Sequence, residues 1–496
     1  MIITARGLGS RILAAAALGA ALTVSAAAKD TLTMGMVLEP PHLDPTAAAA
    51  AAIDEVVYAN VFEGLTRIDR KGEVKPALAA SWEIAEDDVT YTFHLRKGVT
   101  FHDGSDFDCE DVAFTLNRAR AEDSVNAQKR LFAPIESVDC PDPSTAVVKL
   151  SAPTGSFLFD MGWGDAVIVA PETADSNKTD PVGTGPFTFK RWVKGDRVEL
   201  VRNENYWGEP VPLSAATFKF IADPSAAAAA LMAGDLDAFA NFPAPELLPQ
   251  FEADPRFTVV SGTTEGETIL ALNNARPPLN DIRVRRAIAH AVDKQAIIDG
   301  AMFGQGTPIG SHVAPHNPAY IDLTGRYPHD PEKAKELLKE VGAETLKLTL
   351  RLPPPPYARR SGEIAAAQLK EVGIDVEIVP VEWAQWLDQV FKRTDYDMTI
   401  VSHTEPADIE IYARDSYYFN YESRQFRAAY HDYATTLAPA EAKAKLGQLQ
   451  KILAEDCVNV FLFQLAKTGV WNAHVEGIWE NSPVQANDLT DVRWVE

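Results

Sequence analysis

The sequence predicts an α/β protein built from more than one domain, and three observations support this prediction. The chain has 496 residues, 46% of them hydrophobic and 23% charged, which suffices for two or three cores. Residues 346–352, 363–371 and 373–381 show strand, helix and strand periodicity in turn, as an α/β lobe does. Residues 63–170 instead combine several alternating segments with one helix, which is typical of an α+β subdomain.

The first 28 residues have the pattern of a secretory signal peptide. Arg6 and Arg11 precede an apolar run over 12–24, and small residues follow as far as Ala28. The apolar run is shorter than a membrane span requires. We expect cleavage after Ala28 or, as the second choice, after Ala26, and export of the mature chain into an oxidising compartment.

The chain is strongly acidic, with a formal net charge of −24. Phosphate recognition needs a basic face, so this balance argues against a nucleic-acid partner. The negative charge suits a cationic or zwitterionic ligand, although surplus surface acid also serves solubility alone.

Residues 76–114 carry the clearest local signals. Segments 82–84 and 89–95 alternate apolar and polar side chains and predict two antiparallel strands with one buried face. Asp108 then predicts the cap of a helix that begins near Cys109, with acidic residues in its first turn.

The three cysteines are Cys109, Cys140 and Cys457. In an oxidising compartment an odd count allows at most one internal disulfide. Cys109 opens a helix and Cys140 ends a strand running back from the far end of that helix, so this pair can approach bonding distance. Three buried thiols remain the alternative. No cysteine has a second cysteine or histidine at ligand spacing, so we predict no metal site there.

Three stretches resemble the family 5 extracellular solute-binding proteins, the oligopeptide- and dipeptide-binding components of ABC importers. These stretches are residues 76–114, with SWEI, FHDG and DVAF, residues 181–207, with PVGTGPF and NENYW, and residues 271–298, with ALNNARPPLNDIRVRRAI. The resemblance spans nearly the whole mature chain. It implies a two-lobed, hinge-closing periplasmic-binding-protein fold of type II, with the α+β subdomain in the first lobe.

The resemblance also implies a division of the chain and a role. Lobe I is expected at 29–62, 63–170 (the subdomain) and 171–269, lobe II at 270–473, and a return to lobe I at 474–496. The implied protein is monomeric and lies in the periplasm of a Gram-negative cell. It captures a peptide-like or amino-bearing solute between its lobes and delivers that solute to a membrane permease, without a cofactor.

Two stretches are expected to meet the ligand. In the peptide-binding relatives the loop at 38–45 lines the cleft, where Glu39 either contacts the ligand or caps the loop. The tryptophan of an EW motif stacks on the ligand in those relatives, and Trp383 matches it. Trp386 follows three residues later, on the same side of a helix start. A Gly/Pro-rich loop at 304–315 is of the kind that rims a cleft.

The segment 402–412 departs from the family pattern. His403 or its neighbour replaces a tryptophan, and the acid that would accept the ligand's ammonium is either Glu405 or Asp408. A carboxylate in a closing cleft suits an ammonium group. His403 is a single histidine without partners at ligand spacing, so we predict no metal.

The aromatic residues Tyr417, Tyr418 and Phe419 follow, and two other readings of the chain remain open. The same fold could bind an oligosaccharide or an opine-like solute stacked on these rings, Trp383 and Trp386. A secreted hydrolase is the remote alternative, because the sequence shows no nucleophile–base pair, no HExxH and no P-loop.

Overall fold

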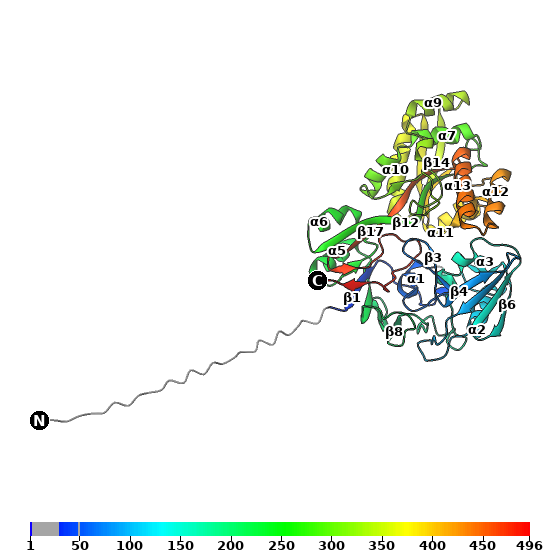
Figure 1. The fold of residues 1–496 in the computed structure, drawn as a ribbon. Coiled ribbons are helices and arrows are strands. Elements are labelled where there is room, and N and C mark those ends of the chain that lie inside the picture. Colours follow the sequence, from blue (N-terminus) through cyan, green and yellow to red (C-terminus); the bar gives the residue numbers. More distant parts are fainter. Residues whose placement is uncertain (2–28, 48–49) are drawn as a thin grey trace.

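The computed structural model describes Met1 and residues 29–47 and 50–496, and shows two lobes, one above the other in Figure 1. The predicted signal peptide lies outside the described residues from 2 to 28. One sheet runs through both lobes in the strand order β15-β14-β16-β12-β17-β11-β1-β10-β9-β8. Helices of the described part of the chain are all too short or too polar to span a membrane.

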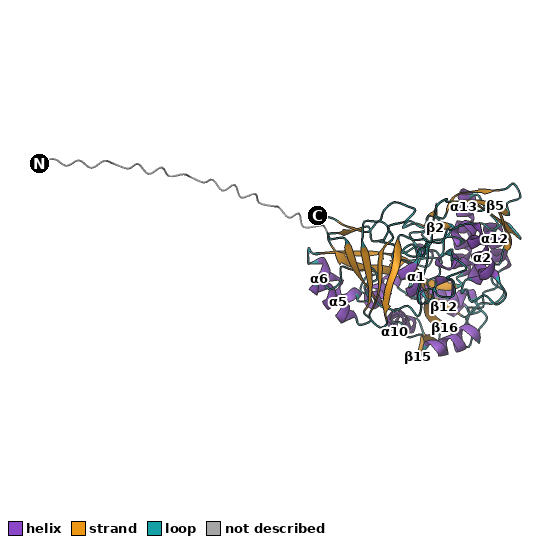
Figure 2. Ribbon diagram, turned by 90° about the horizontal axis from the view of Figure 1, so that it is seen from below, coloured by secondary structure: helices purple, strands orange, loops and turns teal. Residues whose placement is uncertain are grey.

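Lobe I is built on the last strands of that order, with α5 and α6 on one side of them (Figure 2). Strand β1 lies parallel to β10 and β11, and β9 and β8 follow antiparallel. The elements are β1 (Thr31–Met36), α1 (Ala51–Val57), β2 (Thr66–Ile68), β3 (Val74–Pro76), β8 (Phe187–Val193), β9 (Arg197–Arg202), β10 (Ala215–Phe220), α5 (Pro224–Ala233), β11 (Ala238–Phe239), α6 (Leu248–Glu252), β18 (Val475–Glu476) and β19 (Arg493–Trp494).

The helix that follows the alanine tract is shorter than the sequence indicates. Alanine propensity predicts a helix as far as Phe62, but α1 ends at Val57. The cause is Asn60, whose Nδ2 donates to the carbonyls of Val56 and Asn487 at 3.0 and 2.9 Å. This buried side chain competes with the helical backbone bonds and turns the chain.

The subdomain has its own core and a four-stranded sheet in the order β4-β5-β7-β6. Asp108 caps α2 as predicted: its side chain accepts from the Glu110 amide at 2.7 Å, and Asp111 accepts from the Asp108 amide at 2.9 Å. Cys109 and Cys140 form a disulfide, with 5.7 Å between their Cα atoms. The elements are β4 (Ala79–Ile84), β5 (Thr90–Leu95), α2 (Cys109–Arg120), α3 (Lys129–Phe132), β6 (Ile135–Asp142), β7 (Thr145–Leu150) and α4 (Phe157–Asp160).

Lobe II covers its part of the sheet on both faces. Along β12, Leu270 and Leu272 pack into one core while Ile269 and Ala271 pack into the other, which explains the unbroken apolar run there. The elements are α7 (Ile282–Ala291), α8 (Lys294–Met302), β13 (Thr307–Pro308), α9 (Pro331–Glu340), β14 (Leu346–Leu352), α10 (Pro356–Glu371), β15 (Ile374–Pro380), α11 (Trp383–Trp386), the π-helix η5 (Leu387–Lys392), β16 (Met398–His403), α12 (Arg424–Ala434) and α13 (Pro439–Asp456).

Two long antiparallel strands, β12 (Phe257–Leu272) and β17 (Asn459–Asn472), connect the lobes (Figure 1). Their pairing shifts between Thr263 and Glu267, which oppose Ala466 and Gln464, and again between Thr268 and Ile269. At the first shift two extra residues on β12 disrupt the ladder where it passes between the lobes. The chain after β17 packs back onto the lobe I core through Ile478, Trp479, Val484, Leu489 and Val492.

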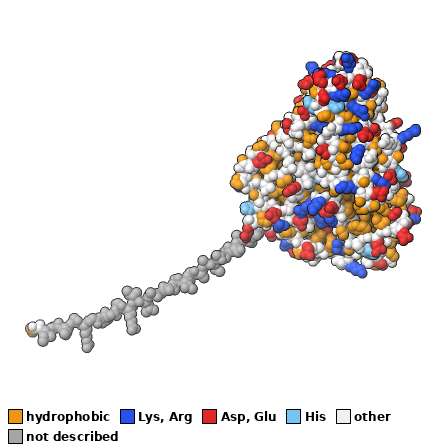
Figure 3. All heavy atoms as spheres, turned by 45° about the horizontal axis from the view of Figure 1, so that its top comes forward, with side chains coloured by type: hydrophobic (Ala, Val, Ile, Leu, Met, Phe, Trp, Pro, Cys, Tyr) orange, Lys and Arg blue, Asp and Glu red, His pale blue; other side chains and the backbone are white. Residues whose placement is uncertain are grey.

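Acidic and basic side chains lie side by side over the end of lobe II (Figure 3). On α9, Lys333 pairs with Glu336 and Lys335 pairs with Glu332. The net negative charge is therefore not gathered at this end of lobe II.

Candidate ligand-binding site

A cavity of about 60 Å³ lies between the lobes and is lined from both of them. This volume admits a small head group, whereas sites for whole small molecules are commonly several hundred Å³. Lobe II lines the cavity with Glu405 and Pro406. Lobe I and its subdomain line it with Asp54, Tyr58, Gln128, Trp163, Gly164, Asp165, Val484 and Gln485.

Three polar atoms in the wall of this cavity are buried without a hydrogen-bond partner in the described part of the chain. They are one carboxylate oxygen each of Asp54 and Asp165 and the indole nitrogen of Trp163. Asp165 is only 7% exposed. Buried polar atoms of native proteins nearly always have a partner. The cavity therefore presents two acceptors and one donor toward a molecule that enters it.

The carboxylates are placed in a low-dielectric setting that disfavours their charge. Burial, and then the carboxylates of Asp165 and Glu55, raise the pKa of Asp54 well above its usual range. Burial raises the pKa of Asp165 to about 7. A cation bound between these groups would lower both pKa values again, because it favours the charged forms.

Close packing at Gly164 places the Asp54 side chain against the segment that carries Asp165. Asp54 comes from α1, and Asp165 from the short 3-10 helix η2 (Gly164–Ala166). A Cβ atom at Gly164 would lie 2.1 Å from the Asp54 carboxylate oxygen, so only glycine permits this approach. Asn126 steadies η2 by donating from Nδ2 to the Asp165 carbonyl at 2.9 Å.

The structure separates the two acids that the sequence left as alternatives. Glu405 is exposed and lines the cavity between the lobes. Asp408 is 5% exposed and points into lobe II, where its oxygens lie 2.7 Å from His312 Nε2 and 3.4 Å from His403 Nδ1. Burial alone would raise the pKa of Asp408, but the two imidazoles outweigh it and hold that pKa well below its usual range.

The predicted aromatic contacts fall into two groups. Trp383 is 41% exposed, and Leu387 and Phe391 are exposed beside it at helical spacing on α11 and η5. Figure 1 shows α11 at the end of lobe II that faces lobe I. This apolar face, formed by Trp383, Leu387 and Phe391, is available to the apolar part of a ligand.

Three other predicted contacts are core residues instead. Trp386, Tyr418 and Phe419 are buried, and Trp386 Nε1 donates to Thr399 Oγ1 at 3.0 Å. Their faces are covered by protein in this structure, so the structure gives no support to the expectation that they stack on a ligand. Tyr417 is half-buried between them and the surface.

Glu39 holds its loop in place. Its Oε1 accepts from Trp192 Nε1 at 2.9 Å and from the Gly195 amide at 3.0 Å. These bonds tie the loop to the β8–β9 hairpin, which corresponds to the second of its two predicted roles. Glu39 is not among the residues that line the cavity between the lobes.

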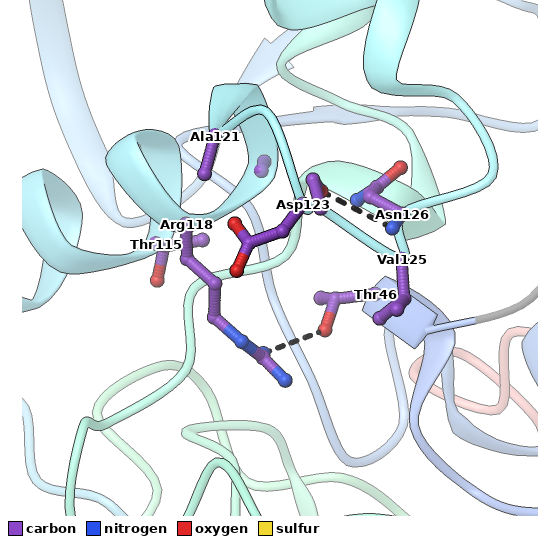
Figure 4. A pocket seen from close by; sticks show the side chains of 9 residues that line it. Thr46, Thr115, Arg118, Ala121, Asp123, Val125 and Asn126 are labelled. Atoms are coloured by element: carbon purple, nitrogen blue, oxygen red, sulfur yellow. Dashed lines mark hydrogen bonds between the residues drawn. The ribbon is translucent and has the colours of Figure 1, made fainter.

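A second cavity, of about 190 Å³, lies beside the end of α2 (Figure 4). Arg118 crosses it and donates to Thr46 Oγ1 at 3.1 Å, and Asp123 and Val125 line it further. All its lining residues belong to lobe I and its subdomain. Movement of the lobes would not enclose a ligand there.

The subdomain also touches lobe II outside the cavity. Arg130 lies 3.0 Å from Glu410, and the Gly155 amide donates to the Ala434 carbonyl at 2.7 Å. The subdomain thus lines the cleft and contacts the opposite lobe. Sequence reasoning missed this role, and with it Asp54, Trp163 and Asp165. The one available signal for Trp163 and Asp165 was the combination of a tryptophan, a glycine and an acid in the WGDA segment.

Comparisons with known proteins agree with the architecture. The family model for bacterial extracellular solute-binding proteins, family 5 (middle part), matches residues 73–422. Heme-binding protein A of Haemophilus influenzae is 32% identical over 350 residues, 63% of each chain. The dipeptide-binding protein of Escherichia coli is 31% identical over 355 residues, 64% of this chain and 65% of that one. The matched region thus spans just under two thirds of these relatives' length. Di/tripeptide-binding protein 1 of Pseudomonas aeruginosa is 30% identical over 397 residues, 73% of each chain.

Solved structures match over nearly the full length. CtaP, an ABC transporter substrate-binding protein of Listeria monocytogenes, superposes with a TM-score of 0.84 at 23% identity and covers 95% of this chain and 100% of its own. DppA of Helicobacter pylori, in complex with the peptide STSA, gives 0.78 at 24% identity and covers 95% and 99%. The predicted two-lobed α/β fold is confirmed by these likenesses.

Proposed function

Because this chain belongs to the bacterial extracellular solute-binding proteins of family 5, we propose that it is the substrate-binding component of an ABC importer. It takes up a peptide-like or other amino-bearing solute in the periplasm, after removal of the signal peptide, and passes it to a membrane permease. It acts as a monomer and without nucleic acid. It binds its solute without making or breaking bonds in it.

One observation carries this proposal. Asp54 and Asp165 each have a carboxylate oxygen without a partner in the described part of the chain, and Glu405 lines the same cavity from the opposite lobe. An ammonium group has three donors and one positive charge, which matches this set of acceptors. The Trp163 indole N–H beside them suits a carbonyl or carboxylate oxygen of the same ligand. Two relatives are named for dipeptides or di- and tripeptides, which fits a solute of this kind.

The rest of the solute lies outside the small cavity. The apolar face formed by Trp383, Leu387 and Phe391 offers contact to side chains of the ligand. An anionic opine is disfavoured by the three carboxylates. An oligosaccharide would find Trp383 and Phe391 exposed, whereas three of the rings that stacking would use, Trp386, Tyr418 and Phe419, are buried.

Binding then selects the closed arrangement of the lobes. Asp165 belongs to the subdomain and Glu405 to lobe II, so an ammonium that contacts both bridges the cleft. Only the closed form supplies both contacts, so the ligand favours that form by their free energy. The register shift in β12 is the place where the lobes rotate.

The test uses ligands and variants that differ in one charge. Mass spectrometry of the purified protein identifies a bound solute, and calorimetry at pH 8 compares that solute or, failing it, a dipeptide library with the N-acetylated forms. We expect acetylation to abolish binding. Glu405→Gln and Asp165→Asn are each expected to weaken binding about 10- to 100-fold, the range for losing a charged hydrogen bond. Glu344→Gln, on the exposed surface of lobe II, is the control.

Two results would contradict the proposal. One is equal affinity for the free and acetylated ligands. The other is unchanged affinity in both Glu405→Gln and Asp165→Asn, because the ammonium would then lie elsewhere.

A further inference from the structure

A second set of polar residues lies inside lobe II, behind the loop that carries Glu405. His312, His403 and Asp408 are all buried, and one ligand atom of each lies within 4.8 Å of the others. His312 comes from the Gly/Pro-rich loop 304–315, and His403 ends β16. The fold thereby supplies the partners that His403 lacks in the sequence.

The outer nitrogens of both imidazoles are held by tyrosine hydroxyls. His312 Nδ1 lies 3.1 Å from Tyr412 Oη, and His403 Nε2 lies 3.0 Å from Tyr418 Oη. With a metal ion bound, these outer nitrogens would carry the imidazole protons, and His312 Nε2 and His403 Nδ1 would be free to bind the ion. Histidines that bind metals are oriented in this way by a hydrogen bond at the other ring nitrogen.

A second buried carboxylate stands next to this set. Glu267 on β12 is directly opposite His403 on β16, so both side chains are on one face of the sheet. Glu267 is 3% exposed, and its Oε2 has no hydrogen-bond partner among residues 29–47 and 50–496. Gln464, its neighbour on β17, likewise has an unpartnered Oε1 in that part of the chain.

Asp408 and Glu267 are two carboxylates buried in the same part of lobe II. A charged carboxylate is costly to bury unless it is paired or binds a metal. No Lys or Arg side chain of the described residues forms an ion pair with Asp408 or Glu267. A divalent cation would neutralise the charge.

We propose that His312, His403 and Asp408 bind one divalent transition-metal ion, whose fourth position is left to water or another small ligand. Imidazole and carboxylate donors suit Zn²⁺, Co²⁺ or Ni²⁺, whereas Ca²⁺ and Mg²⁺ prefer oxygen alone. Ligand atoms of a tetrahedral zinc site lie about 3.4 Å apart, given bonds of about 2.1 Å. The His403–Asp408 separation of 3.4 Å already has this value, and the His312–Asp408 separation of 2.7 Å must widen by less than 1 Å.

The ion would have a consequence for the loop between its ligands. His403 and Asp408 stand on either side of Glu405 in the chain, so an ion bound by both fixes the loop that presents Glu405 to the cleft. The site itself is separate from the cavity between the lobes. Its test can therefore be made on ligand-free protein, and its failure would leave the proposed transport function untouched.

The experiment is calorimetry of Zn²⁺ with chelator-treated protein from which any affinity tag has been cleaved. We expect one equivalent to bind, and Co²⁺ to give the strong visible absorption of a four-coordinate site. His312→Gln and His403→Gln should each weaken Zn²⁺ binding at least 100-fold. Tyr418→Phe keeps all three protein ligands and should weaken binding about 10-fold by freeing one imidazole. His474→Gln, an exposed histidine of lobe I, is the control.

The proposal is overturned if the wild-type protein binds no Zn²⁺. It is equally overturned if the His312 and His403 variants bind Zn²⁺ as the wild type does, because the ion then sits on the surface. If both histidine variants fail to fold, Tyr418→Phe and the Co²⁺ spectrum of the wild type decide: a weak octahedral spectrum with unchanged affinity in Tyr418→Phe rejects the site.

Discussion

Removing the disulfide should loosen the subdomain without unfolding the lobes. The perturbation is the double substitution Cys109→Ala/Cys140→Ala, which retains both Cβ atoms. The disulfide joins the start of α2 to β6 and closes a loop with a sequence separation of 31. The loop-closure relation for a ring of that size gives about 3.7 kcal/mol at 25 °C. Since the subdomain has its own core, this loss acts on its local opening.

Hydrogen exchange read by mass spectrometry measures that opening directly. We expect amides of β5 and β7 in the wild type to exchange through opening of the subdomain. A loss of about 3.7 kcal/mol should then speed this exchange by about 500-fold. Peptides from α7 and α10 in lobe II should keep their wild-type rates. Cys457→Ala is the matched control, because it removes a buried thiol from lobe II and leaves the subdomain intact.

An acceleration of less than about tenfold in β5 would refute the reasoning, because tenfold corresponds to about 1.4 kcal/mol. Equal acceleration in lobe II would refute it as well. The subdomain would then not open as a separate unit.

Three further predictions concern stability and binding. Burial raises the pKa of Asp160 and Asp165 to about 7 each, so the folded state binds more protons than the unfolded state between about pH 4 and 7. The melting temperature should therefore fall as the pH rises through this window. The substitution Asp160→Asn should make this fall in melting temperature smaller. A Cβ at Gly183 would lie 2.0 Å from a backbone oxygen, so Gly183→Ala should lower the free energy of unfolding, measured with urea, by about 3 kcal/mol. Gly325 has open space around it, so Gly325→Ala should change this free energy little. Trp383→Ala should leave the melting temperature nearly unchanged, since the ring is 41% exposed. The same substitution should weaken the binding of solutes with large apolar side chains. If the variant and the wild type bind such solutes equally well, Trp383 does not contact the ligand.

Much of the fold was predictable because its signals are local. The cap at Asp108 and the alternation of 89–95 each act over a few residues, and the structure has these features where the sequence places them. The helix after the alanine tract was predicted too long, because a distant partner of Asn60 ends it. Local propensity carries no information about such partners.

The candidate site was predictable only in part. The sequence indicated the segment 402–412 as the place of a ligand-binding acid, but it left Glu405 and Asp408 as equals. Both are short acidic side chains on one loop, and only packing shows that one faces the cleft and the other faces two histidines. Likewise the sequence predicts Tyr418 and Phe419 as ligand contacts, because aromatic rings occur both in ligand sites and in cores.

By itself the sequence determined the family, the two-lobed fold and the secretory pattern of the N-terminus, since these depend on motifs and periodicities within short stretches. The tertiary structure decided which charges meet. Asp54, Asp165 and Glu405 converge from three distant segments, and His312 reaches Asp408 from another loop. Burial and electrostatic pairing depend on distance in space, and no spacing in the chain encodes those distances.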